Sequence, residues 1–334
     1  MRLARWKTVT GSCFLAALLS LPAWGYDTDT RNTAMPGTLN YVEGQASMGD
    51  QNLDSKSVGK ANLENGQVLE TGNGKAEILL TPGVYLRLGS NSSVKMLNNS
   101  LTNTQVSLQQ GEAMLEVDQL YKENFIHVAQ PGADTRVEKT GLYDFDAANN
   151  KVRVFDGKAV VNADDRNTTV KKDHEVALSG AKIKSHGFDK KEVTQNDDLY
   201  RWSSLRSEYL SQANVQTAQL YYANGWYGPG WYWDPWFAGF TFLPGDGFFY
   251  NPFGWGFYSP LMVWRAPVVV GGGFHHFNGS RPVAIGHGFR NHAVTAFHGG
   301  RGTMARPTGG FHGGAMAGGM HGGGMHMGGA ISHR

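Results

Sequence analysis

A glycine-centred pattern of alternating residues recurs three times in the first half of the chain, at residues 39–48, 106–115 and 152–161. In each copy, large apolar residues lie five and three positions before the glycine, and alanine lies two positions after it. Side chains of a strand point to opposite faces in turn, so alternation on both sides of a glycine predicts two strands joined by a tight turn. Residues 74–78 are a partial fourth copy.

Strand-like segments continue between these copies. Apolar residues alternate over residues 84–88, resume at residues 94–96, and are separated by turn residues such as Pro82-Gly83. Strands of about five residues at spacings of 8–12 residues are typical of all-β folds. We therefore expect a mainly β module over residues 36–180, built as a roll, a sandwich or a short β-solenoid.

Polar residues near the turns of this module are candidates for a binding site. Arg87 and Asn91 flank one glycine turn, and Asp144 and Asp146 flank Phe145. These side chains could bind a small anion, a sugar or a metal. The interpretation that we favour is turn chemistry, in which Asn and Asp bond to the nearby backbone and the alternating Arg87 and Lys95 face solvent.

The same module resembles the FecR domain. The resemblance is carried by GQVLETGNGKAEILL at residues 66–80, PGVYLRLGSNSSV at residues 82–94, QGEA at residues 110–113 and TGLYDF at residues 140–145. It implies a periplasmic β-rich domain, which in the best-known members relays a signal from an outer-membrane transporter to a sigma-factor regulator. Those regulators carry a cytoplasmic helical domain and a membrane helix before the FecR domain. Only about ten residues lie between the predicted cleavage site and the first strand here, so we expect sigma-factor regulation not to be inherited.

The N-terminus predicts export. Positive residues precede an apolar run at residues 13–19, and Ala23 and Gly25 offer the small side chains that a signal peptidase requires. We expect residues 1–25 to be a signal peptide and the protein to reach the periplasm, the cell envelope or the exterior. The apolar run is shorter than the roughly 20 residues of a membrane helix, and no later stretch is longer, so we expect no transmembrane segment in the mature chain.

Cleavage would change both the thiol content and the charge. The single cysteine, Cys13, lies within residues 1–25, together with three of the 30 Lys and Arg residues. The remaining 27 basic residues face 28 acidic ones, so the formal charge of +2 becomes −1. This balance favours no nucleic-acid partner.

One amphipathic helix is expected over residues 196–220. Residues 196–198 offer capping oxygens, and apolar residues then recur at spacings of three and four. The predicted apolar stripe consists of Leu199, Trp202, Leu205, Tyr209 and Ala213. We expect it to pack within the protein, with a partner helix or a membrane surface as the alternative.

An aromatic segment follows at residues 221–264, where 19 of 44 residues are Phe, Trp or Tyr interleaved with Gly and Pro. This composition predicts turns and short extended pieces. Three interpretations remain open: packing on the β module, contact with an envelope or outer-membrane protein or a second copy, and stacking on a glycan. The candidate binding residues are Trp226, Trp231, Trp233, Trp236 and Trp255.

Residues 265–334 form a Gly/His/Met-rich tail that we expect to be disordered. From residue 271 onward, 20 of 64 residues are glycine and nine of the twelve histidines occur. Imidazole and thioether groups suit copper, and imidazole also suits zinc or nickel. The candidate ligands are His275, His276, Met320, His321, Met325, His326 and Met327, although their spacing is not that of a defined site. A flexible tail that responds to pH is the alternative.

No arrangement of residues in the sequence predicts an enzyme or a cofactor. There is no nucleophile elbow, no zinc-protease motif and no phosphate-binding loop. Our main hypothesis is a non-enzymatic exported FecR-type protein that acts as a binding or scaffold module in the periplasm or cell envelope. The alternatives are a sensor in an envelope transport-signalling system and a metal buffer that uses the tail.

Overall fold

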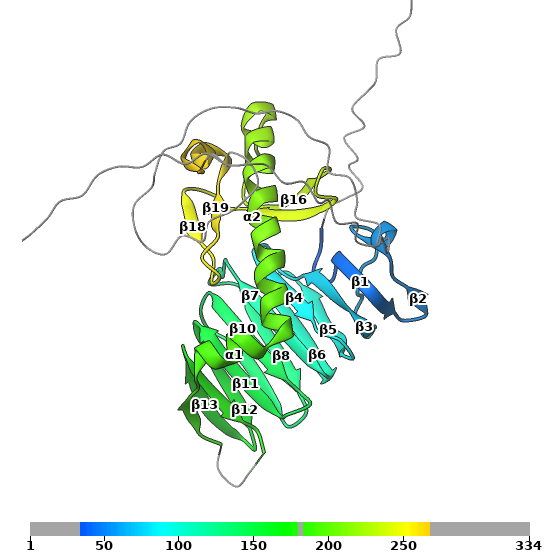
Figure 1. Cartoon of the computed structure of the whole chain (residues 1–334), viewed down its shortest axis with the longest axis vertical. Helices are drawn as coiled ribbons and strands as arrows, with labels where there is room; N and C mark the ends of the chain where they lie inside the picture. Colours follow the sequence, from blue (N-terminus) through cyan, green and yellow to red (C-terminus); the bar gives the residue numbers. More distant parts are fainter. Residues whose placement is uncertain (1–33, 180–182, 268–334) are drawn as a thin grey trace, which may run out of the picture. The chain divides into compact units, whose positions relative to one another are not determined.

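Fifteen strands form a single large sheet in the computed structural model, which describes residues 34–179 and 183–267 (Figure 1). The predicted signal peptide and the candidate ligands of the tail lie outside the described residues. The strands are β1 (Leu39–Met48), β2 (Gln51–Asn52), β3 (Val68–Leu79), β4 (Val84–Leu88), β5 (Ser93–Ser100), β6 (Asn103–Gln110), β7 (Glu112–Val117), β8 (Phe125–Gln130), β9 (Ala133–Val137), β10 (Gly141–Asp146), β11 (Lys151–Asp156), β12 (Lys158–Ala163), β13 (Arg166–Lys171), β14 (His174–Ala177) and β15 (Ser185–Gly187). The prediction of a mainly β module is confirmed.

The sheet folds over on itself and encloses one apolar core. Its strand order is β13-β12-β9-β8-β6-β5-β3-β4-β7-β10-β11-β14-β15, with β1 and β2 attached at β3. The long strand β3 pairs with β5 through residues 68–70 and with β4 through residues 76–79, so it passes from one layer to the other. Apolar residues from both layers, including Leu86, Leu115, Val128 and Val161, pack into the same buried cluster.

The repeated glycines mark corners between the layers, and the prediction of tight hairpins is wrong. β6 pairs with β5 and β8, whereas β7, which follows Gly111, pairs with β4 and β10. Likewise β11 and β12, on either side of Gly157, have different partners, and Gly44 lies at an irregularity inside β1. Gly111 and Gly157 have positive φ values of 77° and 98°. A Cβ at Gly111 would lie 2.6 Å from the Ser92 Cα, so the corner requires glycine.

The strands in the middle of one layer are buried on both faces. Every residue of β4 and β10 is buried, although only alternate residues point into the core. Their outer face is covered by helix α2 (Asp198–Asn224), which follows the short α1 (Lys190–Asn196), and by the segment beyond α2. We call residues 198–265 the aromatic cap.

The aromatic cap contains two hairpins in addition to α2. β16 (Gly230–Asp234) pairs with β17 (Gly239–Leu243), and β18 (Phe248–Tyr250) pairs with β19 (Gly256–Tyr258). The short extended pieces predicted from the sequence therefore pair in register, and a 3-10 helix, η2 (Pro260–Arg265), follows them. A second 3-10 helix, η1 (Ser55–Ser57), lies in the β module.

Helix α2 turns a largely polar side toward the sheet. Its buried residues include Ser203, Arg206 and Ser207, whereas Leu205 and Tyr209 of the predicted apolar stripe are exposed. The prediction that the whole stripe packs inward is therefore wrong, because the sheet surface beneath the helix is itself charged. Within the described part of the chain, no helix has the length and apolar character needed to cross a membrane.

Candidate functional site

A row of charged residues crosses the outer face of the sheet beneath the aromatic cap. Cross-strand partners in an antiparallel sheet lie on the same face, so each pair in the register places its two side chains together. From β3 to β15, this row contains Glu77, Arg87, Met114, Asp144, Arg153, Glu175 and His186. Met114 divides the row, with one group of charges on each side.

The first group, which we call the balanced cluster, consists of Glu77, Arg87, Glu116 and Arg206. Arg87 donates through Nε to Glu77 Oε2 at 2.7 Å and through Nη1 to Glu116 Oε2 at 2.5 Å, and all three side chains are fully buried. Arg206 of α2 donates through Nη2 to Glu77 Oε1 at 2.9 Å. Two guanidinium groups thus neutralise two carboxylates.

The balanced cluster attaches the aromatic cap to the sheet. Glu116 Oε1 accepts hydrogen bonds from the Ser207 hydroxyl at 2.7 Å and from Asn251 Nδ2 at 2.6 Å. On the other side, Asn40 Nδ2 donates to Glu77 Oε1 at 2.9 Å, and Asn40 Oδ1 accepts from the backbone N–H of Phe240 at 2.7 Å. Side chains from the sheet, α2 and the β18–β19 hairpin, together with the backbone of Phe240 in β17, therefore share one buried network.

Charge pairing decides the protonation of this network. Burial alone would raise the pKa of Glu77, but the Arg206 and Arg87 guanidinium groups together lower it to about 2. Burial would likewise lower the pKa of Arg87, but Glu116 and Glu77 hold it above the usual range. The prediction that Arg87 faces solvent is wrong, because the cap covers the face on which it lies.

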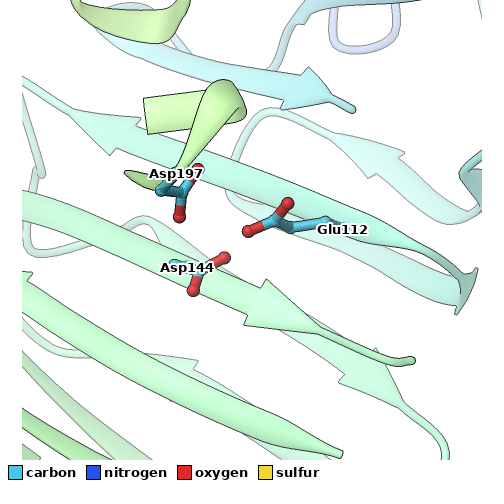
Figure 2. Close-up of side chains that lie close together, drawn as sticks. All are labelled: Glu112, Asp144 and Asp197. Atoms are coloured by element: carbon cyan, nitrogen blue, oxygen red, sulfur yellow. The ribbon is translucent and has the colours of Figure 1, made fainter. Parts of the chain in front are cut away.

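The second group, which we call the acid cluster, consists of Glu112, Asp144 and Asp197 (Figure 2). Glu112 begins β7, Asp144 lies on β10, and Asp197 caps α2 by accepting a hydrogen bond from the Tyr200 N–H at 2.8 Å. One carboxylate oxygen from each residue lies within 4.8 Å of the other two. Three carboxyl groups from separate parts of the chain therefore lie close together.

The acid cluster lacks matching positive charge. Arg153 donates through Nη1 to Asp144 Oδ2 at 2.8 Å, but its Nε donates to Glu175 at 2.8 Å, so it is shared between two carboxylates. Among the residues that the structure describes, neither Glu112 nor Asp197 forms an ion pair. Asp144 Oδ1 is buried and has no hydrogen-bond partner there.

Burial and mutual repulsion act on the carboxyl groups of this cluster. Burial, together with the Asp144 carboxylate, raises the pKa of Glu112 to about 9. Burial also raises the pKa of Asp144 to about 7, with contributions from Asp197 and Asp146, although Arg153 lowers it. The acid cluster therefore favours an added positive charge, whether a proton or a cation.

An open hollow of about 370 Å³ lies beside the acid cluster. Ser90, Asn91, Glu112, Asp146 and Asn149 contribute to its walls. Asp146 lies opposite Glu112 in the register of β10 and β7, and both of its carboxylate oxygens accept hydrogen bonds from Asn149. Solvent thus reaches the edge of the acid cluster at Glu112.

The structure brings together three of the four polar residues that the sequence indicated. Asn91, Asp144 and Asp146 lie at or beside the acid cluster and its hollow, whereas Arg87 lies in the balanced cluster. Sequence reasoning missed Glu77 and Glu116. Their signal was an isolated carboxylate inside the apolar runs 76–80 and 113–117, which is where a buried, paired charge would occur.

Most of the candidate tryptophans pack inside the protein, against the sheet or against other residues of the aromatic cap. Trp231 lies 4.9 Å from Tyr85 and Trp233 lies 5.1 Å from Phe240, measured between ring centroids. The half-buried members are Trp226, Trp231, Trp233 and Trp255. Trp236, by contrast, is 90% exposed.

Comparison with known proteins identifies the β module. Residues 67–184 match the family model described as FecR protein, so the chain contains a FecR domain, in agreement with the resemblance seen in the sequence. No curated protein matches the chain.

Two crystal structures are similar to part of the chain, and both are described as "a putative anti-sigma factor from Parabacteroides distasonis ATCC 8503". The first is 17% identical, with a TM-score of 0.34, over 38% of this chain and 62% of that chain, so the match spans less than two thirds of it. The second is 12% identical, with a TM-score of 0.35, over 53% of this chain and 98% of that chain.

Proposed function

We propose that this protein is a non-enzymatic binding and scaffold module, exported to the periplasm or the cell envelope, whose aromatic cap contacts a partner. The FecR domain relates it to signalling components. The polar outer face of that domain is already occupied by the chain's own α2 and hairpins. A partner would therefore meet the outside of the cap.

The observation that carries this proposal is the set of large apolar side chains that the cap presents to solvent. Tyr227 is 91% exposed, Trp236 is 90% exposed and Trp264 is 70% exposed. Aromatic side chains of this size are enriched in binding surfaces and are costly to leave in water. An envelope or outer-membrane protein, a second copy of the chain or a glycan would use the same side chains.

Affinity capture from an envelope fraction tests the proposal. The bait would be the full chain carrying Tyr227→Ala and Trp236→Ala, compared with the unchanged chain. A matched control would carry Leu101→Ala and Phe125→Ala, because these residues of the β module are 53% and 52% exposed. We expect the cap variant to lose a partner that the control keeps. Identical captured sets from all three baits, or a chain found only in the cytoplasm, would refute it.

The FecR domain also supports a second candidate, a sensor in an envelope transport-signalling system. Such a sensor must pass its signal to a membrane partner. Cross-linking in intact cells, followed by identification of the linked proteins, would test it. A cleaved signal peptide with no linked membrane protein would exclude it.

A further inference from the structure

We infer that the acid cluster of Glu112, Asp144 and Asp197 binds a hard divalent cation, with calcium as the best fit. This inference does not rest on the proposed function, since it concerns residues other than the exposed aromatic side chains. It rests on the position of the three carboxylates, on a buried oxygen without a partner and on the balance of charge.

The separation of the three carboxylates suits an ion placed between them. Calcium lies about 2.3–2.6 Å from its oxygen ligands, so two ligands on opposite sides of the ion are about 5 Å apart. The cluster's oxygens lie within 4.8 Å of one another. Figure 2 shows Glu112 and Asp144 on neighbouring strands and Asp197 above them at the start of the helix, with their carboxylates facing a common point.

The environment of Asp144 gives a second reason to expect a cation, in addition to the grouping of three acids. Its side chain is fully buried, and its Oδ1 has no hydrogen-bond partner among the described residues. A buried anionic oxygen without a partner is strongly unfavourable. Arg153 holds the other oxygen, Oδ2, at 2.8 Å, and Figure 2 shows the Asp144 carboxylate facing Glu112 and Asp197. Near neutral pH a proton on Glu112 can partner Asp144, and a bound cation would take the place of that proton.

The chemistry of the cluster selects the class of ion. All three side chains offer oxygen only, which suits calcium, magnesium or manganese rather than the softer metals that prefer imidazole or thiolate. Calcium accepts irregular sets of six to eight oxygen ligands, including water. The hollow at Glu112 gives water access to the remaining positions.

Calorimetric titration of the metal-stripped full chain with calcium chloride tests the inference, with thermal unfolding as a second readout. Calcium is the suitable probe because the histidines and methionines of residues 265–334 are poor ligands for it. We expect one equivalent to bind and to raise the Tm. Glu112→Gln and Asp197→Asn should each weaken calcium binding about tenfold or more, because ligand charge sets the affinity of such sites. Asn at position 197 can still cap the helix.

Glu70→Gln is the matched control, because it removes one exposed strand carboxylate that is not a member of the acid cluster. It should bind calcium as the unchanged chain does. Near-ultraviolet circular dichroism would show that each variant is folded. The inference is overturned if the unchanged chain shows neither heat nor a Tm shift at millimolar calcium, or if calcium binds equally well to both cluster variants.

Discussion

The balanced cluster and the acid cluster lie on the same face of the same sheet, but within the described residues only the balanced cluster has enough positive side chains to pair with its carboxylates. In the balanced cluster, Arg87 and Arg206 neutralise two glutamates, and the cap supplies further donors. In the acid cluster, Asp144 alone pairs with an arginine in the part of the chain that the structure describes, and that arginine is shared with Glu175. The first arrangement pairs its two glutamates with two arginines of the same chain and attaches the cap. The second has an excess of negative charge, which a cation would neutralise.

The largest effect is expected from Arg87→Met, which leaves Glu77 and Glu116 buried without their shared partner. Breaking a buried ion pair in this way should lower the free energy of unfolding by about 3–5 kcal/mol. The matched control is Arg136→Met, because Arg136 pairs with Glu138 at the surface and is 47% exposed. The Arg136→Met variant should lose at most about 1 kcal/mol of its free energy of unfolding. Urea denaturation measures both, and equal losses would contradict the description of the balanced cluster.

A pH dependence should follow from Glu77, whose pKa is lowered to about 2 by its guanidinium partners. A carboxyl group with a lowered pKa in the folded state stabilises the protein above its unfolded pKa, roughly 4.3, and loses that contribution as pH falls toward 2. Glu77→Gln should therefore cost about 3 kcal/mol near neutral pH and progressively less below pH 4 or so. Thermal unfolding of both proteins across this range would show it. A loss independent of pH would contradict it.

A smaller loss is expected from Ser207→Ala, which removes the hydroxyl that donates to Glu116 at 2.7 Å. Hydrogen bonds to charged groups contribute about 1.5–3 kcal/mol. Ser204→Ala is the control, since it makes the same change on the same helix at a position that is not fully buried. Urea denaturation should separate the two variants. If they lost equal stability, the polar face of α2 would not be a determinant of cap attachment.

In the acid cluster, removing a carboxyl group should increase the free energy of unfolding, whereas in the balanced cluster it should decrease it. Burial and the neighbouring carboxylates raise the pKa of Glu112 to about 9, so burying this acid in the cluster costs free energy near neutral pH. Without added metal, Glu112→Gln removes that cost and should raise the free energy of unfolding by about 1 kcal/mol. Glu70→Gln should change it little, because Glu70 is exposed. Thermal unfolding in a chelating buffer measures the difference. A destabilised Glu112→Gln protein would show that the cluster is not strained by repulsion.

The alternation of residues predicted the inward face of the module but not its connections. Leu108 and Leu115 lie in the core as the pattern required, yet the strands that carry them, β6 and β7, do not pair. A glycine between alternating runs suits a corner as well as a hairpin. Pairing depends on strands distant in sequence, so the local pattern could not decide between the two.

Only part of the candidate site could be predicted from the sequence, for a similar reason. Asp144 and Asp146 are two residues apart, which places them on one face of a strand. Glu112 joins them through the register between β7 and β10, and Asp197 arrives at the start of a helix about fifty residues later. Sequence shows which residues point away from the core. It does not show whether that face meets water or a helix.

The central claim is that the aromatic cap and the FecR domain form one folding unit through the balanced cluster. Every tryptophan of the described residues, from Trp202 to Trp264, lies in the cap, and Trp6 and Trp24 lie in the predicted signal peptide. In a chain beginning at Tyr26, tryptophan fluorescence therefore reports on the cap, whereas the strand signal in far-ultraviolet circular dichroism reports mainly on the FecR domain.

Urea unfolding followed by both signals is the most direct test. Because the buried network joins the two parts, we predict a single transition with the same midpoint in fluorescence and in circular dichroism. A tryptophan transition complete before the strands unfold would contradict the claim.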